Sequence, residues 1–431
     1  MLDTQTKVLN REEKNDQLKR YFQFLLLLLA AGAIYPLLYL RQNFETSILE
    51  AFQITSGDLG NYYSMLGVMY FVCYLPSGWL ADRLTPRMLV TISMVGTGAL
   101  GLWFASIPSK EYLVYIFMSW GIFAGLTFWA SMIKGVKILA KSNEQGRFFG
   151  ILDGGRGLVE AILATIAISI FAYTIEVDAS SNTLALKKVI YMYSYFCIAV
   201  GVLIFLFLKA SDAKQDDEQK VTTKGNLIRD FKTLLSIPEV WLVAVVILCG
   251  YQLFWATYSF SAFMQEGYEV TAVTAGFITV AKLWMRPIGG IGAGFLGDKF
   301  GKENILAMAM SISALGLLMM IFFPKLNTVY GLLAIVLLIG VMTYAVRGLY
   351  WSILDNCNIP LHVTGLAIGI ISLIAYTPDI FLPQIYSLIA AHYEGITIYN
   401  LYFGYIAIIG FVGVLTVLKL RNMTKRKKVL A

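Results

Sequence analysis

Charged residues are scarce in this sequence: of its 431 residues, only 14% are Asp, Glu, Lys or Arg. Typical soluble domains contain about 25% charged and about 45–50% apolar residues, whereas 58% of this chain is hydrophobic. The surface of a water-soluble globule needs more charge than this composition supplies. The composition therefore excludes an ordinary soluble enzyme and a disordered chain, and it indicates a protein whose apolar surface is covered by lipid.

Histidine and cysteine are also few. The two histidines, His362 and His392, are 30 residues apart, and the four cysteines are isolated within apolar stretches. Neither pattern matches a metal site or a disulfide framework. The sequence has no recognisable nucleotide-binding loop or nucleophile–base arrangement. We therefore expect no cofactor, no metal and no enzymatic activity.

Long apolar runs make up most of what is present. A helix needs about 20 apolar residues to cross about 30 Å of hydrocarbon, and runs such as Phe24–Leu40 are continuous, unlike the alternating strands of a barrel. Hydropathy and turn residues predict an all-α polytopic membrane protein with twelve transmembrane helices. The expected spans are 21–48, 58–81, 88–107, 111–139, 147–173, 189–209, 239–265, 271–297, 303–323, 328–354, 363–391 and 397–419.

One long polar stretch divides these spans into six plus six. The expected organisation is an N-terminal tail (1–20), a six-helix bundle (21–209), a middle loop (210–238), a second six-helix bundle (239–419) and a basic tail (420–431). If both termini are inside, the inner segments contain 23 Lys and Arg residues against four in the outer loops. This bias predicts cytoplasmic termini. The net charge of +7 then favours anionic lipid headgroups over nucleic acid as its partner.

A loop motif occurs twice, and it indicates an internal repeat. The first copy follows the second expected span and the other follows the eighth, 216 residues later. Repeats of this kind in transporters place the substrate site at the interface between the halves, near the middle of the membrane. The copies are Gly78-Trp-Leu-Ala-Asp82-Arg83-Leu-Thr-Pro-Arg87 and Gly294-Phe-Leu-Gly-Asp298-Lys299-Phe-Gly-Lys302.

The residue types of this motif suggest a conformational gate. We expect Gly78 and Gly294 to permit close helix approach. The carboxylates are expected to bind free backbone N–H groups or nearby cations, in contacts that break as the halves move. The gate residues are therefore predicted to be Gly78, Asp82, Arg83, Arg87, Gly294, Asp298 and Lys299.

The duplicated motif resembles the loop signature of the major facilitator superfamily, which implies two pseudo-symmetric six-helix halves. Three further segments are similar to the organophosphate:phosphate antiporter family, whose members import glycerol-3-phosphate or hexose phosphates against inorganic phosphate. The resemblance implies that Arg41 is a phosphate ligand, and it puts Lys134 about one position from a fourth-helix arginine of the family. The segments are Leu40–Phe44, Gly57–Gly60 and Gly365–Asp379.

The chain also departs from that family. No arginine occurs in Gly250–Trp255, where the family has one in its seventh helix, and Tyr74 occupies the position of a second-helix lysine. Arg156 stands at the position of the family's fifth-helix histidine. Span five contains Gly154-Gly155-Arg156-Gly157 and lacks the glycine-proline signature of drug:proton antiporters. The substrate is therefore expected to differ from a classical organophosphate, and drug efflux is disfavoured.

Several charged residues fall inside expected spans, where a charge usually faces a cavity or a partner. Asp153, Arg156 and Glu160 share one helix face, as a self-neutralising cluster or as a site where Arg156 exchanges carboxylate for substrate. Lys282 and Arg286 are four residues apart and are expected to share a face. The predicted substrate-binding residues are Arg41, Arg156, Lys282, Arg286, Arg347 and Lys134, and the predicted proton-carrying or charge-pairing carboxylates are Asp153, Glu160 and Asp379.

Aromatic residues in the spans can line a polar cavity or pack against other helices and lipid. Those singled out are Tyr35, Tyr39, Tyr70, Tyr251, Trp255, Tyr258, Trp284, Tyr350 and Trp351.

These features favour a secondary transporter that carries a small organic anion, phosphorylated or carboxylated, by alternating access. One alternative is a proton-coupled symporter for a neutral or zwitterionic solute, and another is a membrane receptor that senses a metabolite. The expected partners are the anionic substrate, a co- or counter-transported proton or phosphate, and the lipid bilayer. The protein is expected to be a monomer in a bacterial inner membrane.

Overall fold

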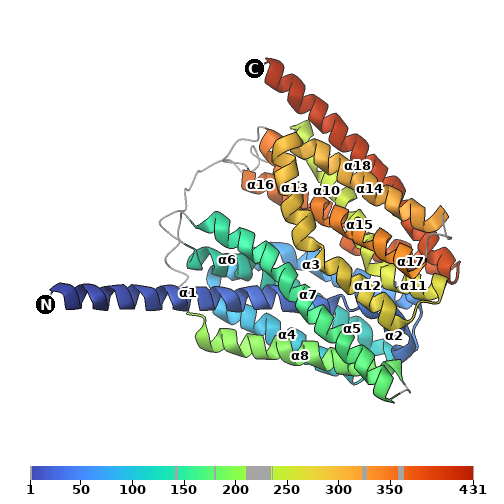
Figure 1. The fold of residues 1–431 in the computed structure, drawn as a ribbon, viewed down its shortest axis with the longest axis horizontal. Helices are drawn as coiled ribbons and strands as arrows, with labels where there is room; N and C mark the ends of the chain where they lie inside the picture. Colours follow the sequence, from blue (N-terminus) through green and yellow to red (C-terminus); the bar gives the residue numbers. More distant parts are fainter. Residues whose placement is uncertain are drawn as a thin grey trace.

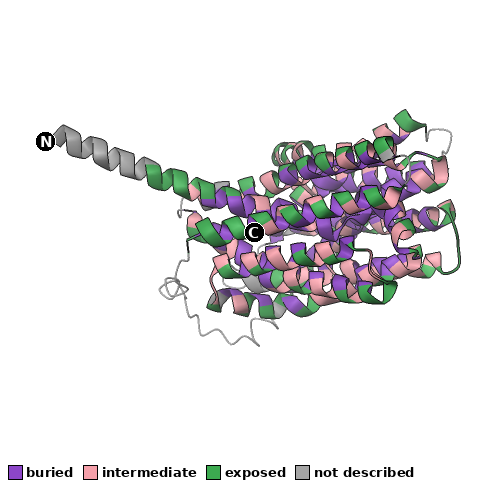
Figure 2. Ribbon diagram, turned by 90° about the horizontal axis from the view of Figure 1, so that it is seen from below, coloured by how far each residue is buried: buried purple, intermediate pink, exposed green. Residues whose placement is uncertain are grey.

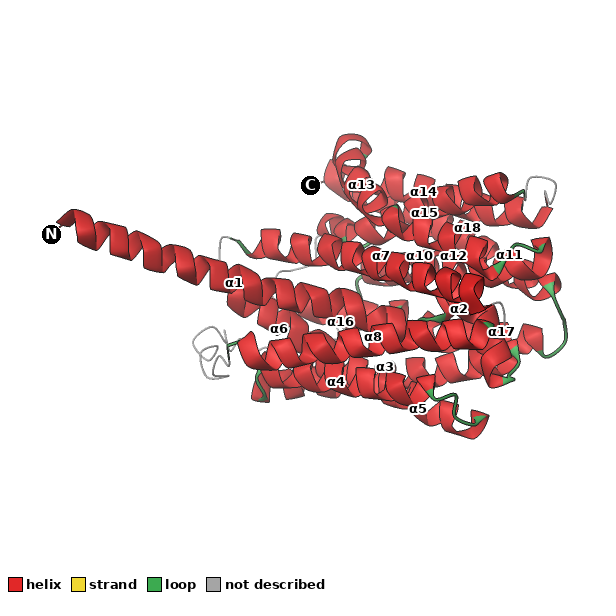
Figure 3. Ribbon diagram, turned by 60° about the horizontal axis from the view of Figure 1, so that its bottom comes forward, coloured by secondary structure: helices red, strands yellow, loops and turns green. Residues whose placement is uncertain are grey.

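A computed structural model describes residues 2–140, 144–178, 181–209, 234, 236–322, 328–357 and 364–430. All regular elements in these residues are helices, and none is a strand (Figure 3). Ten helical stretches among them are long and apolar enough to cross a membrane. The chain is therefore an all-α integral membrane protein, as its composition predicts.

The N-terminal half begins with two helices separated by a short break. The helical stretch at residues 110–139 contains a π-helical turn in its middle. In chain order the elements are α1 (Leu2–Leu38), α2 (Arg41–Phe52), α3 (Ser56–Arg83), α4 (Pro86–Ala105), α5 (Lys110–Ile122), η1 (Phe123–Phe128), α6 (Trp129–Leu139), α7 (Gln145–Asp178) and α8 (Asn182–Phe207). α1 thus already includes most of the expected tail at 1–20.

The C-terminal half contains three interrupted stretches, at η3 and at the α12–α13 and α16–α17 junctions. The expected middle loop lies mostly outside the described residues, and α18 continues through the expected basic tail. The elements are α10 (Pro238–Ala256), η3 (Thr257–Ser259), α11 (Phe260–Tyr268), α12 (Ala272–Trp284), α13 (Arg286–Phe300), α14 (Lys302–Phe322), α15 (Val329–Leu349), η5 (Ser352–Cys357), α16 (Thr364–Ala375), α17 (Pro378–Ala390) and α18 (Ile396–Leu430).

Two expected spans, 58–81 and 271–297, are not among the ten apolar stretches. The first corresponds to α3, which begins with a capping box and carries an acid in its first turn and a base in its last. The second is divided between α12 and α13, so neither piece is long. The total of twelve transmembrane helices and the cytoplasmic position of the termini stay predictions.

The 216-residue repeat extends far beyond the loop motif. It relates the first residue of α3, Ser56, to the first residue of α12, Ala272. It also relates the start of α4 at Pro86 to the start of α14 at Lys302. Equivalent helices of the two halves therefore begin at equivalent positions of the repeat.

The turns before α3 and α12 repeat in detail. Gln53 and Glu269 end their helices in the left-handed region, with φ of 52° and 53°, which is uncommon for residues other than glycine. Thr55 and Thr271 then cap the next helices with their side-chain oxygens, which satisfies backbone N–H groups that lack a partner at a helix start. The same chain reversal therefore occurs in both halves.

The two halves meet mainly at the end of the molecule away from the two termini (Figure 1). α3 packs against α17, α7 against α12, and α2 against α11. Exposed apolar side chains such as Leu415 and Ile408 cover the outside of the helices, whereas the buried residues lie between them (Figure 2). A polar site can therefore form at the contact surface between the halves.

Candidate functional site

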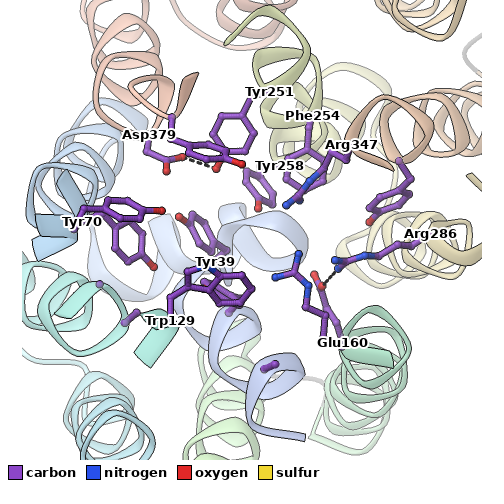
Figure 4. Close-up of a pocket in the computed structure, with 18 residues that line it drawn as sticks. Tyr39, Tyr70, Trp129, Glu160, Tyr251, Phe254, Tyr258, Arg286, Arg347 and Asp379 are labelled. Atoms are coloured by element: carbon purple, nitrogen blue, oxygen red, sulfur yellow. Dashed lines mark hydrogen bonds and ion pairs between the residues drawn. The ribbon is translucent and has the colours of Figure 1, made fainter. Parts of the chain in front are cut away.

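A cavity of about 190 Å³ lies between the halves, and both contribute to its wall (Figure 4). Its lining combines aromatic rings, phenolic hydroxyl groups and five charged side chains. The aromatic residues are Tyr35, Tyr39, Tyr70, Tyr74, Trp129, Tyr251, Phe254, Tyr258, Tyr344 and Tyr376, and the charged residues are Arg156, Glu160, Arg286, Arg347 and Asp379.

Prolines position two of the charged residues. A proline lacks the N–H of the helical hydrogen bond, and its ring clashes with the carbonyl four residues earlier, so it breaks a continuous helix. Pro287 lies in the first turn of α13, directly after Arg286. Pro378 begins α17, directly before Asp379. Each break therefore starts a new helix with a charged side chain at the cavity.

Arginines and carboxylates form a cluster on one side of the cavity. On α7, Arg156 Nη2 lies 2.9 Å from Asp153 Oδ1. From the other half, Arg286 Nη1 lies 3.0 Å from Glu160 Oε2 and Nη2 lies 3.5 Å from Asp153 Oδ1. α7 is unbroken, so its three charged residues share one face as their spacing predicts. Two ion pairs of Arg286 thus connect the halves across the cavity wall.

Arg347 on α15 has a different environment. Its guanidinium carbon lies 4.3 Å from the ring centroid of Phe254, and it has no ion pair with any carboxylate that the structure describes. Tyrosines, among them Tyr251 and Tyr258, are its electrostatic neighbours. A guanidinium stays charged and suits planar oxyanions, and Arg347 is a cavity cation that has no ion pair among the described residues.

Asp379 lies on the opposite side of the cavity from Glu160 (Figure 4). Its Oδ1 accepts hydrogen bonds from Tyr251 Oη at 2.7 Å and from Trp255 Nε1 at 2.8 Å. Within the described part of the chain, no Lys or Arg nitrogen lies within 4.0 Å of it. Neutral donors therefore hold this carboxylate in place without an ion pair.

Arg41 lies outside this cavity. Its side chain is 2% exposed and pairs with Glu45 Oε2 at 3.0 Å, one turn along α2. Nη2 also donates to Ser259 Oγ of the C-terminal half at 3.4 Å, and Tyr386 Oη donates to Glu45 Oε1 at 2.8 Å. The expected phosphate ligand is therefore part of a buried polar contact that closes the end of the molecule away from the termini.

Lys282 and Lys134 also lie away from the cavity lining. Lys282 is 1% exposed, and its Nζ donates to Thr257 Oγ1 at 3.0 Å, inside the C-terminal half. The helix break before Arg286 separates the two cations, so the expectation that they share one face is wrong. Lys134 Nζ donates to the carbonyl of Ala81 at 2.7 Å, near the end of α3.

The aromatic residues divide into cavity and packing positions. Five of the nine aromatic residues singled out in the sequence line the cavity. Trp255 does not line it but donates a hydrogen bond to Asp379. Trp284 instead donates to Thr165 Oγ1 at 3.2 Å, and Trp351 donates to Tyr376 Oη at 3.2 Å. Sequence reasoning missed five aromatic lining residues, although Tyr376 lies just before the Pro378 break. They are Tyr74, Trp129, Phe254, Tyr344 and Tyr376.

The glycines of the loop motif do not approach another helix in this structure. A Cβ at Gly78 or at Gly294 would meet nothing within 4 Å, so the expected close approach is absent here. The reason is their position beyond the region where the halves touch. On the same helix, a Cβ at Gly67 would lie 2.2 Å from the carbonyl oxygen of Asp379.

The charged residues of the motif contact aromatic rings. Arg83 lies over Trp79 at 3.9 Å and Arg87 over Phe205 at 4.7 Å, while Lys299 lies over Phe300 at 5.2 Å. Asp298 is exposed and has no hydrogen bond or ion pair within the described residues, contrary to its expected pairing. The side chain of Asp82 lies outside the described residues.

The fold, the repeat and the cavity between the halves together define a membrane transporter. The sequence model of the Major Facilitator Superfamily matches residues 21–383, and the chain belongs to this superfamily of transporters, which are not enzymes. This confirms the resemblance derived from the duplicated loop motif.

Relatives and a solved structure agree with this assignment. Inner membrane protein YihN of Escherichia coli (strain K12) is 28% identical over 415 residues, covering 95% of this chain and 97% of that protein. "Putative glycerol-3-phosphate transporter 1" of Arabidopsis thaliana is 25% identical over 287 residues, covering 58% and 53%. The crystal structure of a bacterial homolog of the human lysosomal transporter Spinster, inward-facing and unoccupied, matches with a TM-score of 0.72 at 12% identity, covering 95% and 97%.

Proposed function

We propose that this protein is a secondary transporter of the inner membrane that carries a small organic anion by alternating access. The observation that carries this proposal is Arg347, a guanidinium on the cavity wall without a described carboxylate partner. A charge in such a site is costly unless an opposite charge arrives. An anionic substrate supplies that charge.

Arg156 and Arg286 extend the same site. Both line the cavity while they share the carboxylates of Asp153 and Glu160. An oxyanion bound at Arg347 competes with those carboxylates for the two guanidinium groups. Since Arg286 pairs with residues of the other half, this competition changes the contacts that hold the halves together. Substrate binding is thereby coupled to reorientation of the halves.

The proposal is tested by binding to purified protein in lipid nanodiscs. Inorganic phosphate, glycerol-3-phosphate and succinate are compared with uncharged glycerol by thermal shift and by calorimetry. We expect at least one anion to bind and glycerol not to bind. Arg347→Gln should weaken anion binding by about tenfold or more, because a hydrogen bond to a charged group contributes about 1.5–3 kcal/mol. Lys188→Gln, at an exposed position of α8, is the matched control and should leave binding unchanged.

Equal binding of the anions by the wild type and by a folded Arg347→Gln variant would place the anion site elsewhere. Binding of glycerol but of none of the anions would contradict an anionic substrate altogether.

The second candidate is a proton-coupled symporter for a neutral or zwitterionic solute. The observation that favours it is Asp379, a carboxylate on the cavity wall that only neutral donors contact. Glu160 is less suited to this role because it is paired with Arg286. Transport that requires a pH gradient and does not depend on substrate charge would favour this candidate over the first.

A further inference from the structure

A second hollow lies beside the central cavity, between α3 and the α16–α17 stretch. It measures about 430 Å³ and is mainly apolar. We call it the lateral pocket. Its apolar lining includes Phe71, Ile370, Leu373 and Ile380, and Gly67 and Gly369 also border it.

The lateral pocket adjoins the proposed transport site. Four residues line both spaces: Tyr70, Tyr74, Tyr376 and Asp379. The arginines of the cavity lie on the other side, on α7, α13 and α15 (Figure 4). The central cavity therefore has a cationic side, the lateral pocket is apolar, and phenolic rings lie in the wall that the two spaces share.

The size of the central cavity also points to the lateral pocket. Small-molecule sites typically measure about 300–1,000 Å³, and the central cavity alone, at about 190 Å³, is below that range. Together with the lateral pocket, at about 430 Å³, it falls within the range. A ligand that occupies both spaces thus extends beyond the charged region.

Some apolar side chains that line the lateral pocket are partly exposed in this structure. Phe71 is 46% exposed and Leu373 is 37% exposed, although both line the pocket. A Cβ at Gly369 would meet nothing within 4 Å, so the space beside α16 is open. An apolar group of several carbons that leaves water for this space gains the free energy of burial.

We propose that the lateral pocket is an apolar subsite of the transport site, and that the substrate is an amphipathic organic anion. Its charged head binds at Arg347, and its alkyl or aryl part passes Tyr376 and occupies the lateral pocket. This inference rests on the proposed transport of an organic anion and specifies the chemical class of that anion.

The test is a homologous series of ligands with one head group and increasing chain length. Methyl, propyl, butyl and hexyl phosphate are titrated into the protein in nanodiscs, with the corresponding alcohols in parallel. Burial of a methylene contributes about 0.8 kcal/mol, which corresponds to an affinity gain of about fourfold for each added carbon. We expect this gain for the phosphates until the pocket is filled, and weak or no binding of the alcohols.

Two variants test whether the gain in affinity with chain length arises in the lateral pocket. Gly369→Leu fills open space next to α16, so the gain per carbon should disappear while methyl phosphate binds as in the wild type. Leu373→Asn makes the same wall polar and should reduce the gain without filling the pocket. The control is Gly404→Leu on α18, where a Cβ would meet only Ile321 Cδ1 at 3.9 Å, and it should retain the full chain-length dependence.

The outcomes separate this inference from the proposed function. Equal binding of all the phosphates would overturn the lateral subsite and leave the anion site intact. Failure of all the phosphates and of inorganic phosphate to bind would overturn both. A chain-length effect that is the same for alcohols, or that persists in Arg347→Gln, would mean that the pocket holds membrane lipid, and it would overturn the amphipathic substrate.

Discussion

At the scale of single residues, the charged side chains of the cavity have distinct partners. Arg156 and Arg286 share carboxylates, Arg347 has aromatic neighbours, and Asp379 accepts hydrogen bonds from neutral donors. Charge inside a membrane protein marks a functional position more often than not, but the partner of each charge decides what it can do. Among the described residues of the cavity, Arg347 and Asp379 form no ion pair, and we propose them as the groups that meet substrate and a proton.

The first prediction concerns Asp379→Asn. The amide oxygen can still accept the hydrogen bonds from Tyr251 and Trp255, so the local geometry should persist while the exchangeable proton is lost. We expect substrate exchange without a gradient to stay within about threefold of wild type, since an anion meets one carboxylate fewer. Uphill uptake driven by a pH gradient in proteoliposomes should fall to background if Asp379 carries the proton.

Glu160→Gln is the comparison for that experiment, because Glu160 is paired with Arg286. It should alter affinity rather than proton coupling. Retention of full gradient-driven uptake in a folded Asp379→Asn protein would exclude Asp379 as the proton carrier.

The positions of the individual charges were only partly predictable from the sequence. Arg156, Arg286, Arg347 and Asp379 stood out as ionisable groups in apolar segments, and the structure places all four on the cavity wall. Arg41 stood out for the same reason and by family resemblance, but its depth along the helix and its pairing with Glu45 depend on contacts with the other half. Such contacts between distant segments leave no local signal in the sequence.

At the scale of helices, the interruptions determine which side chains reach the cavity. An uninterrupted helix keeps residues four apart on one face, as α7 does. The break between α12 and α13 instead directs Lys282 toward Thr257 and leaves Arg286 at the cavity. The proline was visible in the sequence, but the spacing argument assumed a regular helix, and that assumption failed at this position.

The second prediction is that Pro287→Ala restores helical continuity and displaces Arg286. The contacts of Arg286 with Glu160 and Asp153 should weaken, and affinity for the anion should fall by about tenfold, near the contribution of one charge-assisted hydrogen bond. Thermal stability should change little, because Pro287 lies in the first turn of α13, where proline is compatible with a helix. Binding calorimetry and thermal unfolding measure the two effects.

Pro238→Ala is the matched control. Pro238 lies at the first position of α10, where proline is compatible with a helix, so affinity should not change. Wild-type affinity in Pro287→Ala would show that the break is not needed to position Arg286.

The third prediction compares two glycines of α3. A Cβ at Gly67 would lie 2.2 Å from the backbone oxygen of Asp379, whereas a Cβ at Gly78 would meet nothing within 4 Å. Gly67→Ala must separate α3 from α17 and should destabilise the protein by about 1–3 kcal/mol, the usual cost of overpacking. Gly78→Ala should be neutral or stabilising by up to about 1 kcal/mol, since alanine favours the helix.

Thermal unfolding in the same detergent compares the two variants directly. Equal stability of both would mean that α3 and α17 are not as closely packed as described.

At the scale of the whole molecule, the internal repeat could be predicted and the asymmetry between the halves could not. The offset found in the loop motif also relates the left-handed caps at Gln53 and Glu269. The functional side chains do not follow it: the residue 216 positions after Tyr70 is Arg286, and both line the cavity. The repeat therefore builds two similar walls, and at this position one half presents a phenol to the cavity and the other a guanidinium.

The fourth prediction concerns the contacts that join the halves at the end away from the termini. Thr46 Oγ1 donates to Gln265 Oε1 of the other half at 2.7 Å, so Thr46→Cys with Gln265→Cys should react readily with a short bifunctional thiol reagent. Alternating access requires this end to open, and the cross-link should therefore abolish transport while substrate still binds.

Arg83→Cys with Lys299→Cys, at the other end of α3 and α13, is the control pair and should cross-link poorly in the same state. The native cysteines Cys73, Cys197, Cys249 and Cys357 are buried and should contribute little background. Undiminished transport by a fully cross-linked Thr46–Gln265 pair would contradict movement of the halves about the cavity. Faster cross-linking of the Arg83–Lys299 pair on addition of a bound anion would show that occupation of the arginine site drives the opposite closure.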